Sequence, residues 1–206
     1  MTPGKKTGVR KQHHLLRALQ VESITELLRE CEKKTDIRPA ASSLFWTLGA
    51  KQVGKAAIVG WRDVLIPALR TPEIDVAIWP FEGSLFDLIS SRKITVAETY
   101  PAEACLHLGM SPPGRGWSKT NQSDRASQGK YIWNWLCSRK IQTESRLLKM
   151  IRAGFGPSKD SEDPFDALVG LLSMLEVVLG YRPTGESCVN EIRSIEGWIL
   201  GQSGSG

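Results

Sequence analysis

Two segments that share the same order of residue types constrain the fold of this chain most strongly. "IDVAIWPFEG" at residues 74–83 and "KITVAETYP" at residues 93–101 each contain a short apolar run, a carboxylate, an aromatic residue and a proline. The runs 76–79 and 94–97 lack polar alternation, which is typical of strands covered by helices on both faces. Two such strands among helical segments predict an α/β fold.

Helical periodicity accounts for much of the remaining sequence. Residues 15–31 carry apolar side chains at helical spacing and predict one surface helix. A second helix is predicted over 53–69, with Pro67 kinking or ending its last turn. Further helical material is expected after residue 130. The segment "DPFDALVGLLSMLEVVLGYRP" predicts a buried helix that begins at Asp163 and ends at Gly180.

Length and composition indicate one compact domain. The chain has 206 residues, of which 41% are apolar and 24% charged, and we expect a single domain over 15–200 between a basic disordered arm, 1–14, and a disordered tail, 201–206. No apolar run is long enough to cross a bilayer and the N-terminus is polar, so we expect a cytoplasmic protein without a membrane partner. The four widely spaced cysteines contain no CxxC pair and are interpreted as thiols.

Positive charge is concentrated in two stretches. The net charge is +5, which permits a polyanionic partner without requiring one. Residues 1–17 contain five Lys or Arg and no acid, and residues 114–130 contain Arg115, Lys119, Arg125 and Lys130 with one acid. Both stretches are interpreted as loops, which are either simply solvated or positioned to contact phosphates.

Carboxylates are the side chains best suited to chemistry here, because the histidines lack ligand-like spacing and no phosphate-binding loop motif occurs. Glu98 follows a predicted strand, while Asp163 and Asp166 share the first turn of the last predicted helix. Divalent cations such as Mg²⁺ prefer oxygen ligands held on rigid elements. The alternative is structural: Asp163 would cap the helix, Asp166 would favour its dipole, and Glu98 would face solvent or pair with a cation.

Four motifs in order, "AIWPFEG", "AETYPAEA", "KTNQSDRA" and "DPFDALVGLL", resemble an uncharacterised family of predicted nucleases with a ribonuclease-H-like fold. The resemblance covers about residues 45–200. It implies a mixed sheet flanked by helices, with acidic residues around one or two divalent ions. Glu98 matches the family's strand-end acid, Asp166 its helix acid and Asp163 a neighbouring acid, while Lys119 and Arg125 fall in its basic stretch.

The chain departs from that family at its N-terminus. A ribonuclease-H-like domain begins with strands, the first of which carries an essential Asp, and neither precedes the first predicted helix here. We therefore expect the fold to be incomplete at its N-terminus, with an open sheet edge that a complementing N-terminal chain or a homodimer would cover.

Three functions follow from the residues and the resemblance. In the first, Glu98, Asp163 and Asp166 hold Mg²⁺ or Mn²⁺ in a metal-dependent nuclease, and Arg115, Lys119, Arg125 and Lys130 contact substrate phosphates. In the second, the chain lacks the first-strand Asp and is a non-catalytic remnant or a nucleic-acid-binding module. In the third, it is one half of a split domain.

Overall fold

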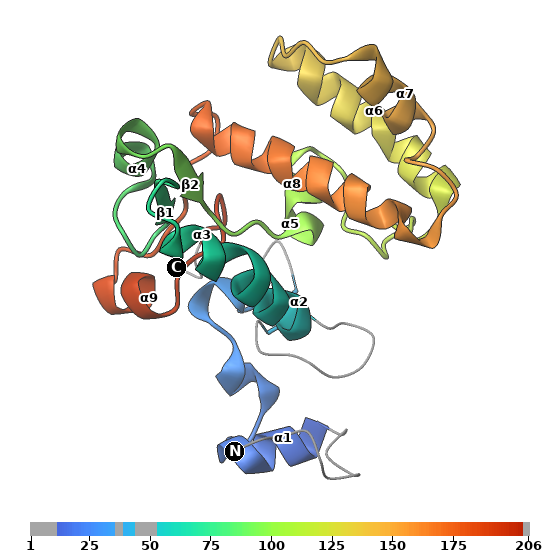
Figure 1. Ribbon diagram of the computed structural model, residues 1–206. Coiled ribbons are helices and arrows are strands. Elements are labelled where there is room, and N and C mark those ends of the chain that lie inside the picture. The colour runs from blue at the N-terminus through green and yellow to red at the C-terminus, as the bar shows by residue number, and fades with distance from the viewer. Residues whose placement is uncertain (1–11, 36–38, 44–52, 204–206) are drawn as a thin grey trace. The chain divides into compact units, whose positions relative to one another are not determined.

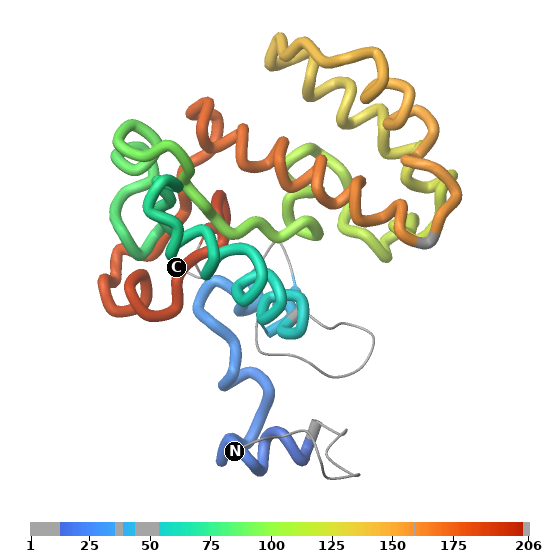
Figure 2. The backbone as a smooth tube through the Cα atoms, viewed as in Figure 1, coloured from blue at the N-terminus to red at the C-terminus, as the bar shows by residue number. Residues whose placement is uncertain are grey.

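The computed structural model describes residues 12–35, 39–43 and 53–203. These residues form a mixed α/β structure, as predicted, in which most regular elements are helices (Figure 1). They fall into two compact units, where the sequence predicted one domain. Unit 1 comprises the described residues up to 97 together with 186–198 and 203, and unit 2 comprises 98–185 and 199–202. Figure 2 follows the chain from the first unit into the second and back again.

The two predicted strands are present in unit 1. β1 (Val76–Ile78) and β2 (Ile94–Val96) pair in parallel, with Val76 opposite Ile94, and α4 (Leu85–Ser91) lies between them in sequence. Ser84 begins α4, because its hydroxyl accepts a hydrogen bond from the backbone N–H of Asp87. β1 is mostly buried whereas Ile94 is 47% exposed, so the predicted burial on both faces does not extend to the start of β2. In the described part of the chain the sheet has only these two strands.

The first predicted helix, 15–31, is wrong beyond residue 19. α1 (Gln12–Leu19) ends there, and two separate 3₁₀ turns follow, η1 (Ile24–Leu27) and η2 (Glu30–Glu32). Gln20 has φ = 58°, a left-handed conformation that stops the helix. The Glu26 carboxylate then accepts the backbone N–H of Ser23 at 2.8 Å and starts a new turn.

The second predicted helix is present and is interrupted before its proline. α2 (Val53–Gly60) continues through a π-helical turn, η3 (Trp61–Leu65), into α3 (Ile66–Arg70). Pro67 has no N–H to donate, and its ring would crowd the carbonyl four residues earlier. The wider π turn immediately before it relieves that crowding while the Ile66 N–H still bonds to the Trp61 carbonyl. Unit 1 also contains α9 (Asn190–Ile195).

Unit 2 is helical and has its own core. α8 (Glu162–Val178) confirms the predicted helix, which begins one residue before Asp163, directly after the 3₁₀ turn η4 (Lys159–Ser161). One face of α8 is buried, whereas Leu171 on the other is 51% exposed, so the predicted burial is only partial. The other helices are α5 (Pro101–His107), α6 (Gln122–Ser138) and α7 (Ser145–Arg152). The core is lined by Cys105, Ile132, Trp135, Phe165 and Val169, all at most 5% exposed.

Part of the basic stretch predicted as a loop is helical. Residues 122–130 form the first half of α6, because the Asn121 side chain accepts the Ser123 N–H and caps the helix. The start of the predicted disordered tail is also ordered: Gln202 is 1% exposed, and the Gly201 N–H bonds to the Thr184 carbonyl at 2.8 Å.

The predicted basic arm lies outside the described residues except for residues 12–14, which belong to α1. Residues 204–206 of the predicted tail lie outside them as well. Within the described ranges, no helix is both long enough and apolar enough to span a bilayer.

Candidate functional site

Glu98 is the first residue of unit 2 and pairs with another segment of the same unit. Its backbone forms a parallel bridge with Ile199, and its carbonyl accepts the Leu200 N–H at 2.9 Å. The neighbouring Thr99 packs against Gly170 of α8, one turn after Asp166. Thr99, the residue after Glu98, therefore reaches α8, and Glu98 itself is half-buried.

Asp166 is engaged by a lysine from the basic stretch. The Lys119 ammonium donates to Asp166 Oδ2 in a close ion pair, in which both side chains are about one quarter exposed. The other oxygen, Oδ1, is buried and has no hydrogen-bond partner among the described residues. Lys119, predicted to contact substrate, thus contacts a predicted catalytic acid in this structure.

Asp163 is exposed in the first turn of α8 and is not the predicted cap, because the helix begins before it. Pro164 is tolerated in this turn because the first N–H groups of a helix have no intrahelical acceptor. Within the described residues, no group of three or more His, Cys, Asp or Glu side chains is arranged to hold a metal ion. Glu98, Asp163 and Asp166 are all described, and they do not form such a group in this structure.

The surroundings of Asp166 shift two pKa values. Burial raises the pKa of Asp166 above its ordinary value, and the hydrogen bond and charge of Lys119 only partly offset this effect. Cys105 on α5 lies in the same environment, where burial and then the Asp166 charge raise the pKa of its thiol to about 12. All four cysteines are thiols, as predicted, and Cys105 stays protonated at neutral pH.

Arg125 is buried and does not present its guanidinium to solvent, contrary to its predicted role at substrate phosphates. It is 1% exposed and donates to the carbonyls of Gly154 at 2.9 Å, Gly156 at 2.7 Å and Lys119. The Ser118 N–H also donates to Asp124 at 2.8 Å, so hydrogen bonds hold the backbone on both sides of the Lys119 Cα atom. Arg125 therefore positions Lys119, and the sequence pattern did not distinguish this role from phosphate contact.

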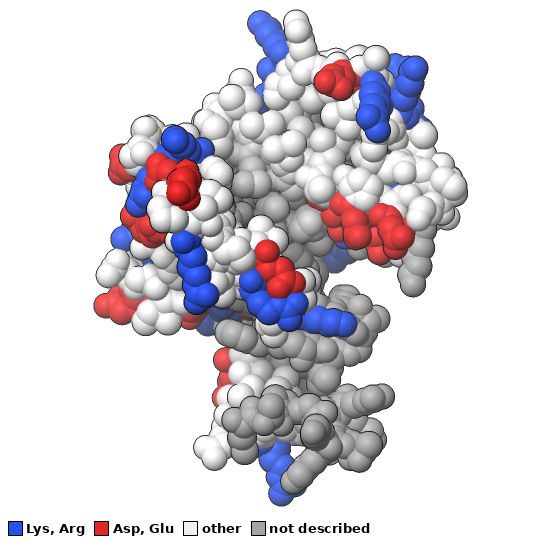
Figure 3. All heavy atoms as spheres, viewed as in Figure 1, with Lys and Arg blue, Asp and Glu red and all other residues white. Residues whose placement is uncertain are grey.

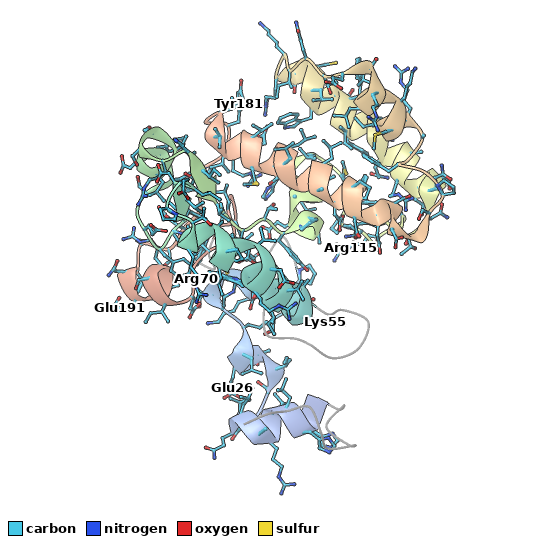
Figure 4. The ribbon with its side chains drawn as sticks, viewed as in Figure 1. Glu26, Lys55, Arg70, Arg115, Tyr181 and Glu191 are labelled. Carbon is cyan, nitrogen blue, oxygen red and sulfur yellow. The ribbon has the colours of Figure 1, made fainter. Side chains whose placement is uncertain are left out.

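The remaining two predicted cations are exposed. Arg115 lies in the loop before α6 (Figure 4), and Lys130 lies on α6. Lys130 lines a groove between α6 and α7 together with Trp133 and Arg152, neither of which the sequence analysis singled out. The structure thus separates the four predicted cations into two that are used internally and two that face solvent.

A second polar cluster links α5 to α8. His107 Nδ1 lies 2.7 Å from Ser173 Oγ, and His107 Nε2 lies 3.9 Å from Glu103 Oε1. The order of side chains resembles that of a hydrolytic triad, but the histidine–carboxylate distance exceeds a hydrogen bond. Ser173 is 1% exposed, so a substrate has no access to its hydroxyl. The cluster acts as a packing contact between the two helices.

Comparisons with protein-family models, with curated proteins and with solved structures found no match to this chain.

Proposed function

We propose that this chain is a ribonuclease-H-like protein that binds nucleic acid without hydrolysing it. The observation that carries the proposal is the ion pair between Lys119 and Asp166. In the catalytic hypothesis, the Asp166 carboxylate binds a divalent cation. In the structure, the Lys119 ammonium occupies the place of that cation. The fold assignment within this proposal rests on the four sequence motifs.

The ion pair is supported by the structure around it. Arg125 holds the Lys119 carbonyl and Asp124 holds the preceding N–H, so Lys119 needs little reordering to stay on Asp166. A divalent cation would have to displace the ammonium from a partly buried carboxylate, and no group of three or more His, Cys, Asp or Glu among the described residues is arranged to hold it. Such a site would bind Mg²⁺ weakly.

The binding half of the proposal rests on charge. Arg115 is exposed, as are five of the seven Lys and Arg in residues 122–152, a stretch with two acids; of the other two, Arg125 is buried and Arg139 pairs with Glu176. Cations that face solvent on a rigid helix pair are suited to phosphate contact, and each contact releases counterions from the nucleic acid.

The test measures binding and cleavage in the same samples. End-labelled single-stranded and double-stranded oligonucleotides are titrated with the full chain, with and without Mg²⁺ or Mn²⁺, and then separated on a denaturing gel. We expect an anisotropy increase with every label remaining on full-length strands. Metal-dependent shortening by the parent protein, abolished by Glu98→Gln and Asp166→Asn, would overturn the proposal.

Metal-dependent phosphodiester hydrolysis is the second candidate function, and Asp166 Oδ1 is the observation that favours it. This buried oxygen has no hydrogen-bond partner in the described part of the chain and is the kind of donor a Mg²⁺ or Mn²⁺ ion would take. Lys119→Met, with Lys55→Met as an exposed control, separates the two candidates. If Mn²⁺ raises the melting temperature of Lys119→Met alone, the lysine competes with a metal; if neither variant responds, the acids do not form a metal site.

A further inference from the structure

Unit 2 has a groove between α6 and α7 that the sequence motifs do not predict. Its volume is about 300 Å³, at the small end of ligand sites in proteins. Gly129 and Ile151 lie at its base, where a Cβ on Gly129 would come within 3.0 Å of the Ile151 side chain. The absent side chain lets the two helices approach closely, and Leu148 and Ala126 add further apolar surface.

Trp133 lines this groove and is 46% exposed. Its neighbour on the same helix, Trp135, is 5% exposed and donates its indole N–H to Glu176. The two tryptophans therefore have different roles: Trp135 belongs to the core, while Trp133 presents a large flat apolar surface to solvent. An aromatic ring in this position is available to stack on another ring.

Two cations line the groove together with the indole. Lys130 and Arg152 line the same groove, both are exposed, and neither forms an ion pair with another described residue. Lys130 Nζ lies 5.0 Å from the centroid of the Tyr131 ring, a contact that leaves its charge unneutralised. On the face drawn in Figure 3, separate groups of Lys and Arg side chains lie over α6 and α7, with an acidic side chain between them.

We propose that this groove binds one unpaired base of a single-stranded nucleic acid, with Trp133 stacking on the base and Lys130 and Arg152 contacting the adjoining phosphates. A nucleotide strand combines planar bases with charged phosphates, which matches one exposed indole and two unpaired cations in a single groove. An acidic peptide would satisfy the cations and leave the indole without a stacking partner. This inference rests on the proposed function and names its site.

The test uses the full chain and an end-labelled oligothymidylate, followed by fluorescence anisotropy. Trp133→Ala should weaken binding about 10-fold or more, the range expected for losing one stacked base. The matched control is Trp61→Ala, which removes a tryptophan of similar exposure, 42%, from unit 1 and should leave affinity unchanged. Thermal melts followed by circular dichroism establish that each variant is folded.

Two further ligands separate stacking from charge. An abasic strand of the same length should bind the parent and Trp133→Ala equally, whereas Lys130→Gln and Arg152→Gln should weaken binding of both strands. Equal affinity of the parent and Trp133→Ala for oligothymidylate overturns the assigned site, as does polyglutamate competing as well as oligothymidylate. If the parent binds no oligonucleotide at all, the proposed function fails instead, so the two failures are distinguishable.

Discussion

Lys119 and Arg125 illustrate how little residue type says about the role of a cation. Both come from one basic stretch, yet Lys119 pairs with a carboxylate and Arg125 is enclosed by carbonyls. The guanidinium suits the second role, because its donors form a fork that reaches several acceptors at once. Which of the two roles a cation takes depends on the backbone carbonyls and carboxylates that the fold brings next to it. The residues adjacent to it in sequence do not reveal these partners.

Arg125→Met should destabilise the protein by about 3 kcal/mol, because it leaves buried carbonyl groups without donors. Arg115→Met removes an exposed guanidinium from the same stretch and should change the free energy of unfolding by less than about 0.5 kcal/mol. Chemical denaturation of the two variants measures the contrast. Similar stability of both variants would mean that Arg125 is not a structural residue.

Cysteine exposure gives a second prediction at this scale. Cys137 and Cys188 are exposed, while Cys31 and Cys105 are buried and the pKa of Cys105 is raised to about 12. Titration of the native protein with a thiol reagent near neutral pH should therefore show two rapidly reacting thiols, and the denatured protein four. Rapid labelling of Cys105, located by peptide mapping, would contradict its placement in the core.

Among the elements, α8 was predictable and the first helix was not, for a physical reason. A long apolar segment with few polar interruptions packs against whichever elements surround it. The position of α8 could therefore be predicted from its own sequence. Residues 15–31 carry apolar side chains at helical spacing, but the left-handed conformation of Gln20 ends the helix despite that periodicity. The α6–α7 groove depends on a contact between Gly129 and Ile151, which are distant in sequence and whose pairing no local pattern reveals.

The contact between α8 and the segment after β2 is tested by Gly170→Ala. In an exposed helix this change stabilises by about 1 kcal/mol, but here the new Cβ would lie 2.9 Å from Thr99 Cγ2. We expect a net loss of about 1 kcal/mol from overpacking. Thr99→Ser removes the offending methyl group, so the same change in that background should become neutral or stabilising. A double-mutant cycle with no coupling would show that Thr99 does not pack on α8.

Glu176 joins α8 to α6 and makes stability depend on pH. Its carboxylate accepts hydrogen bonds from Trp135 at 2.6 Å and Arg139 at 2.8 Å, and Arg139 stacks on Tyr181 just beyond α8. Burial raises the pKa of Glu176, but these hydrogen bonds and the nearby arginine charges outweigh burial and place it below its ordinary value of 4.5.

Because the folded pKa is lowered, the stabilisation is fully present above pH 4.5 and is lost as the pH falls through the folded pKa. Glu176→Gln should therefore be less stable than the parent near neutral pH, with a difference that shrinks in acid. Denaturant midpoints measured over this pH range provide the comparison. A difference that stays constant with pH would mean that the charge of Glu176 contributes nothing.

For the molecule as a whole, the question is whether nucleic acid responds to the net charge of +5 or to one site. A strand attracted by all basic segments, including the four Lys and Arg of residues 1–11, would neutralise many phosphates at once. A strand held at the α6–α7 groove contacts Lys130 and Arg152 only. Affinity at a single salt concentration does not separate these cases, whereas its salt dependence counts the phosphates neutralised.

Two phosphate contacts to a single strand predict that the logarithm of the binding constant falls with the logarithm of salt concentration at a slope of about −1.4. Arg152→Gln should reduce the magnitude of this slope by about 0.7, because one contact is lost. Replacing Lys5, Lys6, Arg10 and Lys11 together by Gln in the full chain should leave the slope unchanged. A much steeper parental slope that the arm substitutions flatten, while Arg152→Gln does not, would move binding from the groove to the basic N-terminal segment.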